Sequence, residues 1–544
     1  MKKLMALLLA ATFALGTLAG CGGDKDNATV ETSKGSPELV TWNLKAEPKT
    51  LDPTLNQAVD SGQVINHTFE GLYAERLGGK LVPGVAKDHE KINNEDGTVT
   101  YVFNLRDNAL WSDGKQVTAN DFVFSWRRAV DPATAASYSY IMAPIVNATE
   151  ISAGEKAPEE LAVEAVDDLT LKVTLVTETP FFLELTAFPT FMPLREDVVD
   201  NDGIWARDPE RCISNGPYVL SNYTLGDHLE LTKSETYWNK DAIKVNNLKG
   251  LMIGESNTTL AAFRDGKLDL SEGAPTGEIP QLIASGELQI LPYLGTYFYV
   301  INSTTDNEAL KNPLVRQAIN LAIDRQAICD NVVRGGQVPA TGFVCPGIKD
   351  SEGKDFRAEA GNYYLSPNAN IEKAKELLKE AGYENGEGIG EIEIAYNTDD
   401  NHKAIAEAVM EMLKQVGIKV KLDNQEWQVF QQNRNTLSYP DIARHGWIGD
   451  YHEAQTFLDM YTSGNINGAN GYSSAEYDAL IAKALASDGK ERDDAFYAAE
   501  EILVNDAFII PIYFYTTPLL VNENLDNWSF SELGKIWLGE VTYK

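Results

Sequence analysis

Residues 391–422 decide the fold class, and they read EIEIAYNTDDNHKAIAEAVMEMLKQVGIKVKL. Apolar side chains alternate over residues 391–396 and again over 418–422, which is the two-residue period of a half-buried strand. Between them, residues 403–416 carry apolar side chains at helical spacing, and Gly417 follows as a helix stop. A strand, a helix and a strand in succession predict a β-α-β unit within an α/β fold.

The same two periods recur along the chain. Alternation predicts strands over residues 98–105 and 169–176, and regular structure is expected to begin near residues 39–42. Residues 371–381 have the pattern of an amphipathic helix. The glycine-rich run 386–390 precedes a strand rather than a helix, so we predict a turn there and not a phosphate-binding loop.

One loop of the β-α-β unit is a candidate ligand site. Residues 397–402 read NTDDNH and connect the first strand to the helix, with His402 at the helix start. Ligands of α/β sheets tend to lie beyond the carboxyl ends of strands. We therefore expect ligand contacts from this loop.

The N-terminus has the pattern of an exported protein. Lys2 and Lys3 precede a short apolar run, residues 4–15. That run is shorter than the roughly 20 residues that span a bilayer, so it indicates a secretory signal rather than a membrane helix. We expect a signal peptide over residues 1–20.

The end of this signal resembles a bacterial lipobox. Residues 18–21 read LAGC, and in a lipobox the cysteine receives lipid and becomes the first residue of the mature protein. Cys21 is therefore the expected lipidation site, and residues 21–36 are a flexible tether poor in apolar side chains. The protein would then be anchored to the extracytoplasmic face of the cell membrane, facing the periplasm if an outer membrane exists. The alternative is an ordinary secreted protein with a chance cysteine.

The length and the charge of the chain limit the classes of function that it can have. The chain has 544 residues and a formal charge of −34, which becomes −36 without Lys2 and Lys3. So long a chain is expected to form two or three lobes. So acidic a chain repels nucleic acid and anionic lipid, so membrane attachment must come from the lipid. We find no nucleophile elbow, zinc-protease pair or phosphate loop, which favours binding over catalysis.

Three cysteines remain besides Cys21. They are Cys212, Cys329 and Cys345, and no Cys-x-x-Cys pair occurs. Cys329 and Cys345 could form a disulfide in an oxidising compartment, or all three could be reduced and structural. No metal or cofactor site is indicated.

A longer motif carries a family resemblance. Residues 110–126 read LWSDGKQVTANDFVFSW and resemble the signature of the family 5 extracellular solute-binding proteins of peptide-importing ABC transporters. Further similar segments are KTLDP (49–53), FEGL (69–72), SNGPY (214–218), YWN (237–239), VRQAI (315–319), NQEW (424–427) and ARHGWIGDY (443–451). The resemblance covers nearly the whole mature chain and is closest to the oligopeptide-binding branch, whose members are lipoproteins in some bacteria.

The resemblance implies a periplasmic-binding-protein-like α/β fold with mixed sheets, two hinged lobes and an extra subdomain. Lobe I would comprise residues 37–69, 198–299 and 517–544. The subdomain would comprise residues 70–197, and lobe II residues 300–516. The lobes would close on a ligand held in the cleft between them.

The resemblance also implies how a peptide's charged ends are bound. Asp450 matches the acidic partner of the ligand's α-amine, a charge-assisted hydrogen bond. Arg444 and His402 match positions used for peptide carboxylates of different chain lengths. The alternatives are an aspartate that stabilises a turn beside Gly449, an ion pair of Arg444 within its lobe, and a solvated helix start at His402.

Strand geometry constrains this assignment. Six residues of straight strand from Arg444 to Asp450 would span about 20 Å, whereas an extended tripeptide covers about 10 Å. The chain is therefore expected to bend between them, and Gly446 and Gly449 permit a bend.

Other positions match the walls of the family's cleft. Tyr138, Trp447 and Tyr515 match aromatic wall residues, with plain core packing as the alternative. Gln57 and Val59 fall where the family pairs its backbone with the ligand like an added strand. Gln57 replaces a glutamate of the family.

The implied function is that of a monomeric receptor without enzymatic activity. It would capture short peptides and deliver them to a membrane permease driven by separate ATPase subunits. Alternatives are another solute (a dipeptide, a metal chelate or a signalling peptide), a receptor that passes peptide to a sensor, and a secreted peptidase.

Overall fold

The computed structural model of the protein describes residues 38–200 and 203–544. The predicted signal peptide, the lipidation site Cys21 and the tether lie outside these residues. Within the described part of the chain, no helix has both the length and the apolar character needed to span a membrane.

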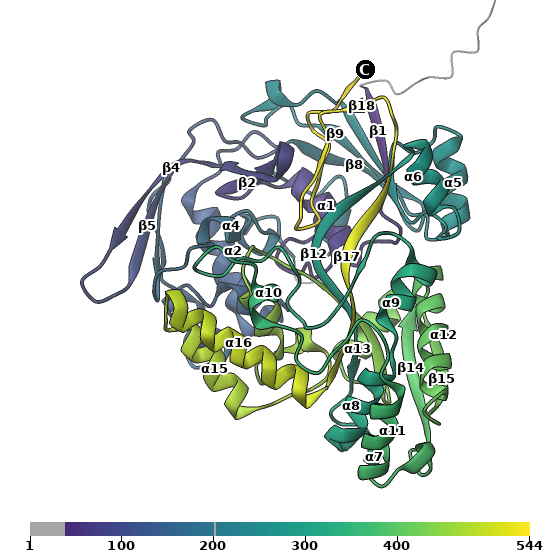
Figure 1. The fold of residues 1–544 in the computed structure, drawn as a ribbon. Coiled ribbons are helices and arrows are strands. Elements are labelled where there is room, and N and C mark those ends of the chain that lie inside the picture. The colour runs from purple at the N-terminus through teal and green to yellow at the C-terminus, as the bar shows by residue number, and fades with distance from the viewer. Residues whose placement is uncertain (1–37, 201–202) are drawn as a thin grey trace, which may run out of the picture. The chain divides into compact units, whose positions relative to one another are not determined.

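A mixed sheet of eleven strands forms the centre of the described residues (Figure 1). Its order is β15-β14-β16-β12-β17-β11-β1-β10-β9-β8, and β13 pairs with β17 beside this path. The strands are β1 (Leu39–Asn43), β8 (Tyr218–Thr224), β9 (His228–Lys233), β10 (Asn247–Leu251), β11 (Leu270–Glu272), β12 (Leu288–Ile301), β13 (Val338–Pro339), β14 (Glu391–Asn397), β15 (Lys419–Gln425), β16 (Ile442–Ile448) and β17 (Ile509–Val521). The predicted α/β class and mixed sheet are confirmed.

The β-α-β unit is also confirmed. β14 and β15 are parallel neighbours, and α12 (Asp400–Lys414) connects them. The helix begins three residues earlier than its apolar period predicted. The carboxylate of Asp399 accepts hydrogen bonds from the backbone N–H groups of Asn401 and His402, and this N-cap starts the helix at Asp400.

Two long strands link the halves of the sheet, and Figure 1 shows them crossing its centre together. β12 pairs with β16 in one half, whereas β17 pairs with β11 in the other. The β12–β17 register shifts between Pro292 and Thr296 and again between Tyr297 and Phe298. Residues 293–295 therefore have no partner on β17, and the ladder is interrupted in the middle of the sheet.

A separate antiparallel sheet with the order β4-β5-β7-β6 lies against α2 (Ala119–Val130). Its strands are β4 (Ala86–Asn93), β5 (Val99–Leu105), β6 (Val163–Asp167) and β7 (Thr170–Leu175). The motif LWSDGKQVTANDFVFSW leads into this helix. Thr118 and Asp121 form a capping box at its start, and Phe122 and Trp126 are buried beneath it. The motif thus encodes a helix start and its buried face.

The remaining elements are shorter or surround these sheets. The other strands are β2 (Tyr73–Arg76), β3 (Lys80–Pro83), β18 (Leu525–Asp526), β19 (Ser529–Phe530), β20 (Ile536–Trp537) and β21 (Thr542–Tyr543). The other α-helices are α1 (Val59–Thr68), α3 (Ala148–Ser152), α4 (Phe182–Leu185), α5 (Ser256–Arg264), α6 (Ile279–Ser285), α7 (Glu308–Lys311), α8 (Pro313–Ala322), α9 (Arg325–Ala327), α10 (Phe356–Ala360), α11 (Ile371–Glu380), α13 (Trp427–Asn435), α14 (Gln455–Leu458), α15 (Ala475–Leu485) and α16 (Gly489–Asp506). α11 and the turn at 386–390 match their predictions.

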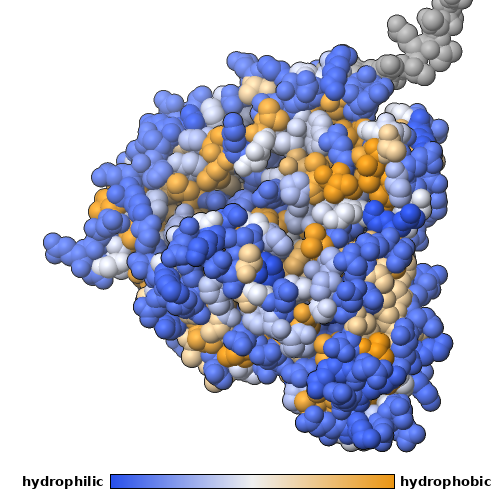
Figure 2. Space-filling model, in the orientation of Figure 1, coloured by the Kyte–Doolittle hydropathy of each residue, from blue (hydrophilic) through white to orange (hydrophobic). Residues whose placement is uncertain are grey.

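The cysteines of the described residues are not bridged, and the visible surface is polar. The face shown in Figure 2 is mainly hydrophilic, with separate apolar patches. Cys212, Cys329 and Cys345 are buried free thiols, so of the two alternatives for Cys329 and Cys345 the structure has the reduced one.

Asp52 holds the segment after β1 against α2. Its carboxylate is fully buried and accepts hydrogen bonds from Arg128 of α2 at 3.0 and 2.8 Å. The indole N–H of Trp205 donates to the same carboxylate at 3.3 Å. This pair is a buried, two-pronged contact of the kind that arginine makes with carboxylates.

We predict that Asp52→Asn lowers the free energy of unfolding by about 3 kcal/mol, because it leaves Arg128 without its counter-ion. Chemical denaturation measures the change. The matched control is Glu376→Gln, which removes an exposed ion pair with Lys373 and should lower stability by less than about 0.5 kcal/mol. Equal effects of the two substitutions would contradict the prediction.

Candidate functional site

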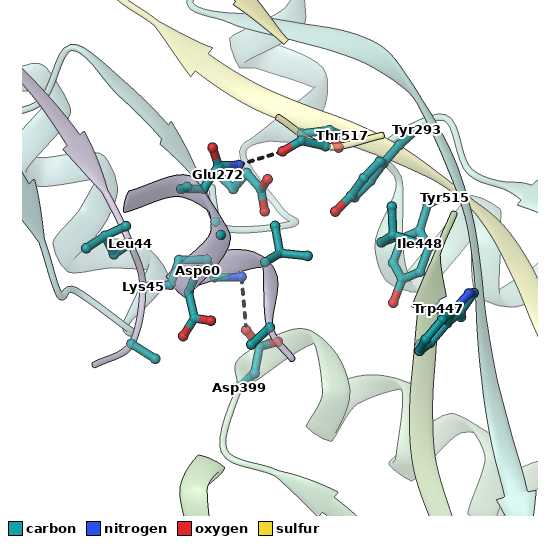
Figure 3. A pocket seen from close by; sticks show the side chains of 18 of the residues that line it. Leu44, Lys45, Asp60, Glu272, Tyr293, Asp399, Trp447, Ile448, Tyr515 and Thr517 are labelled. Carbon is teal, nitrogen blue, oxygen red and sulfur yellow. Dashed lines mark hydrogen bonds and ion pairs between the residues drawn. The ribbon is translucent and has the colours of Figure 1, made fainter. Parts of the chain in front are cut away.

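A cavity of about 480 Å³ opens in the middle of the sheet. This volume lies within the range of small-molecule sites. In Figure 3, Trp447 and Tyr515 follow one wall, and Lys45 and Asp399 meet on the opposite side. All eight residues predicted as ligand contacts line this cavity: Gln57, Val59, Tyr138, His402, Arg444, Trp447, Asp450 and Tyr515. Among the residues described, no group of three or more His, Cys, Asp or Glu is placed to hold a metal.

Asp450 is a buried carboxylate with weak partners. Its side chain is 8% exposed and receives only long hydrogen bonds, from the hydroxyls of Tyr140 and Thr456, both at 3.4 Å. Burial raises the pKa of Asp450 to about 7, although these two hydroxyls, the charge of Lys535 and the hydroxyl of Tyr138 oppose the shift. The carboxylate contacts side chains rather than turn amides, so its position favours a ligand contact over the turn alternative.

The Asp450 pKa makes stability depend on pH. Because burial raises this pKa from 3.8 to about 7, the folded protein holds the proton more tightly than the unfolded chain, and stability falls as pH rises between those values. We predict that Asp450→Asn, which mimics the protonated form, gains roughly 2–4 kcal/mol over the wild type across this interval. Chemical denaturation at a series of pH values measures the difference. Parallel curves would show that Asp450 is not perturbed in this way.

Arg444 lies on the cavity wall without an acidic partner. It projects from β16, donates to the Tyr515 hydroxyl at 3.3 Å, and places its guanidinium 5.0 Å from the Tyr297 ring centre. Its Nε has no hydrogen-bond partner. No carboxylate of the described residues lies within ion-pair distance, so the alternative of an ion pair within the lobe is not what the geometry shows.

Arg434 is a second unpaired arginine, and the sequence reasoning missed it. It lies on α13, its Nε also lacks a partner, and burial lowers its pKa to about 10. Trp427, Gln431 and Arg434 all line the cavity from this helix. Their spacing of four and then three residues is that of one helix face, and this was the available signal.

His402 is not a cationic partner in this structure. Burial and the nearby charge of Arg444 lower the pKa of His402 to about 3, so the ring is neutral. Its Nδ1 lies 3.4 Å from the Tyr297 hydroxyl. The expected anion-binding amides of the helix start are occupied, because Asp399 accepts from the N–H groups of Asn401 and His402. His402 can therefore offer a ligand a neutral hydrogen bond.

A lysine not predicted from the sequence faces this loop. Lys45 follows β1 and pairs with Asp399 at 3.6 Å, which Figure 3 marks with a dashed line. Burial would raise the pKa of Asp399, but its interactions with His402, Lys45 and Arg444, in that order, hold it below its ordinary value. The pair joins β1 to the start of α12 across the cavity.

The three aromatic residues both line the cavity and pack. Tyr138 stacks on Trp447, with ring centres 6.1 Å apart and an interplanar angle of 9°. The Trp447 indole N–H donates to the carbonyl of Thr456 at 2.7 Å. Tyr515 packs beside Tyr293 at 5.7 Å. Their orientation is therefore fixed by protein contacts.

Of the two glycines that permit the expected bend between Arg444 and Asp450, Gly446 lies in a straight strand, and the chain bends only after Gly449. Every residue of β16 from Ile442 to Ile448 pairs with β12 without a register shift, so the chain leaves the strand only beyond Ile448. Gly446 has another role: a Cβ there would lie 2.4 Å from the Tyr515 hydroxyl. Glycine is needed for this close approach.

Val59 also differs from its prediction. It opens α1, so its backbone is helical rather than an extension of the strand-like segment, and Ala58 before it is the extended N-cap. Strand-like pairing with a ligand is therefore available only up to Ala58. The Gln57 side chain accepts a hydrogen bond from Asn435 of α13 at 3.3 Å.

Comparison with known proteins identifies relatives over the whole chain. The family described as bacterial extracellular solute-binding proteins, family 5 (middle part), matches residues 80–469. The oligopeptide-binding protein OppA of Bacillus subtilis is 34% identical over 556 residues, covering 100% of both chains. A crystal structure of Haemophilus influenzae OppA in complex with RPPGFSPFR matches with a TM-score of 0.85 and 35% identity, covering 93% of this chain and 99% of that one.

Two structures of the murein tripeptide binding protein MppA differ in their agreement. The structure from Escherichia coli matches with a TM-score of 0.84 and 32% identity, covering 93% of this chain and 98% of that one. An unliganded open form of MppA matches with a TM-score of only 0.60 and 33% identity, covering 90% and 94%. The present chain therefore superposes less well on the open form of MppA than on the other MppA structure.

Proposed function

The chain belongs to the bacterial extracellular solute-binding proteins of family 5, and from this premise we propose that it captures short peptides in the cavity and delivers them to an ABC importer. The observation that carries the proposal is the pattern of unpaired charge. Among the described residues, Asp450 has no cation within ion-pair distance, although the charge of Lys535 acts on it from farther away, and neither Arg434 nor Arg444 has a carboxylate within that distance. A peptide supplies an ammonium and a carboxylate, which complement both groups. The named relatives bind oligopeptides, and the family is one of binding proteins rather than enzymes.

We propose that the division into two lobes and a subdomain given above describes the moving parts. The interrupted β12–β17 ladder supports this division, because a register shift weakens the sheet locally. Asp450, Arg434 and Arg444 all belong to lobe II, so closure would bring lobe I over a ligand that they hold. Delivery to the permease and its ATPase subunits follows from the role of the family.

We predict that Asp450→Asn raises the Kd of a short free-amine peptide at least about 100-fold, because a buried charge pair is lost. Isothermal titration calorimetry above the Asp450 pKa measures this. The control is Asp459→Asn: Asp459 is half-buried and its pKa is also raised to about 7, but it does not line the cavity. Its Kd should change by less than about threefold.

A second experiment uses a peptide whose α-amine is acetylated. Acetylation should weaken binding to the wild type strongly and binding to Asp450→Asn hardly at all, because the two changes remove the same contact. Additive losses would place the amine elsewhere. A solute without an amine, such as a metal chelate, would bind independently of Asp450.

We further propose that lipid on Cys21 holds the receptor at the outer face of the membrane. The LAGC motif and the acidic surface support this, because a chain of charge −34 is repelled by anionic lipid. When the full chain is expressed in bacteria, the wild type should partition into a detergent phase and Cys21→Ser into the aqueous phase. The control Cys212→Ala should behave as the wild type. Detergent partitioning of Cys21→Ser would refute the anchor.

A further inference from the structure

We propose that the cavity selects peptides with a basic side chain, lysine or arginine, and that Asp60 and Glu272 bind it. The inference rests on the proposed peptide-binding function and narrows its substrate class. It concerns the side of the cavity opposite Trp447 and Tyr515, where Figure 3 labels Asp60 and Glu272.

Besides Asp450, two carboxylates of the lining have no cation within ion-pair distance among the described residues. The charged residues of the lining are Asp60, Glu272, Asp399 and Asp450, and Lys45, Arg434, Arg444 and Lys535. Lys535 forms an ion pair with Glu75 at 3.2 Å, and Glu75 is not part of the lining. Lys45 forms an ion pair with Asp399. The two arginines and Asp450 suit the ends of a peptide, so Asp60 and Glu272 remain without a cation.

The surroundings of these two carboxylates confirm that the protein does not satisfy them. Asp60, in the first turn of α1, accepts one hydrogen bond, from the neighbouring N–H of Ser61 at 2.8 Å. No hydrogen bond or ion pair to the Glu272 carboxylate occurs among the described residues. Burial raises the pKa of Asp60 to about 6 and that of Glu272 above its ordinary value, although Lys45 opposes the latter. A ligand cation would relieve this desolvation.

Two neutral side chains add an independent observation. Asn397 and Gln431 line the same cavity and are 8% and 3% exposed. The side-chain oxygen of each has no hydrogen-bond partner. Buried oxygens of this kind are normally satisfied, and here no donor of the described residues reaches them, so each can accept from a ligand. Lysine and arginine side chains supply three and five N–H donors and no acceptor, whereas an acidic side chain supplies none.

The experiment is a scan of one side chain along a peptide. Lysine is placed at each position of an alanine tetrapeptide, and each peptide is compared with its norleucine counterpart, which has a similar aliphatic stem but no charge. Calorimetry should give about tenfold tighter binding for lysine at one position, with the preference reduced by added salt. In Asp60→Asn/Glu272→Gln the lysine-to-norleucine ratio should fall to about 1. The exposed control Glu155→Gln should keep the wild-type ratio.

The outcomes separate this inference from the proposed function. Equal binding of lysine and norleucine peptides at every position would overturn the inference and leave peptide capture intact. A lysine preference that persists in the double variant would also overturn it, by assigning the preference to other residues. If no peptide of either series binds the wild type, the proposed function itself fails. Circular dichroism and binding of the norleucine peptides show that the variants are folded.

Discussion

The pairing of β12 with β17 is the constraint on which the site depends. These two strands carry the hydrogen-bonded ladder from one half of the sheet to the other, and their register breaks at residues 293–295. Tyr293, in this break, lines the cavity. β16 and β17, on either side of β12, then present Arg444 and Tyr515 to the same space. Gly446 permits their contact, because any Cβ there would meet the Tyr515 hydroxyl.

The cavity beside this break separates charges that would otherwise neutralise each other. Asp450 is surrounded by tyrosine and threonine hydroxyls, which hold a carboxylate without neutralising it. Arg444 is held by Tyr515 and Tyr297, which orient a guanidinium in the same way. Ionised groups buried without partners cost several kcal/mol each, so such an arrangement persists where a ligand provides the missing charges. The neutral hydroxyls of the cavity wall thus orient Asp450 and Arg444 without neutralising their charges.

The sequence predicted the strands, helices and cavity residues that depend on local period and motif. It did not predict contacts between segments that lie far apart in the chain. The strands and helices around residues 391–422 follow from their apolar spacing, and all eight predicted residues line one cavity. Lys45 was not predicted, because its role depends on Asp399, which lies far along the chain. His402 was expected to attract an anion, but the adjacent Asp399 caps the helix amides and burial keeps the ring neutral. The straightness of β16 could not be inferred from Gly446, since only the approach of Tyr515 explains that glycine.

These charges also determine when the cavity can be closed. Lys45–Asp399, Gln57–Asn435 and Ser256–Asp400 connect its two sides, at 3.6, 3.3 and 3.0 Å. Polar contacts of this kind contribute at most about 1 kcal/mol each. Together they contribute at most about 3 kcal/mol, which is less than the several kcal/mol per group lost by enclosing Asp450 and the two arginines without partners. Closure around an empty cavity is therefore unfavourable, and a ligand that pairs the enclosed charges shifts the population towards the closed state. A ligand lacking one charged end would leave part of this cost uncompensated.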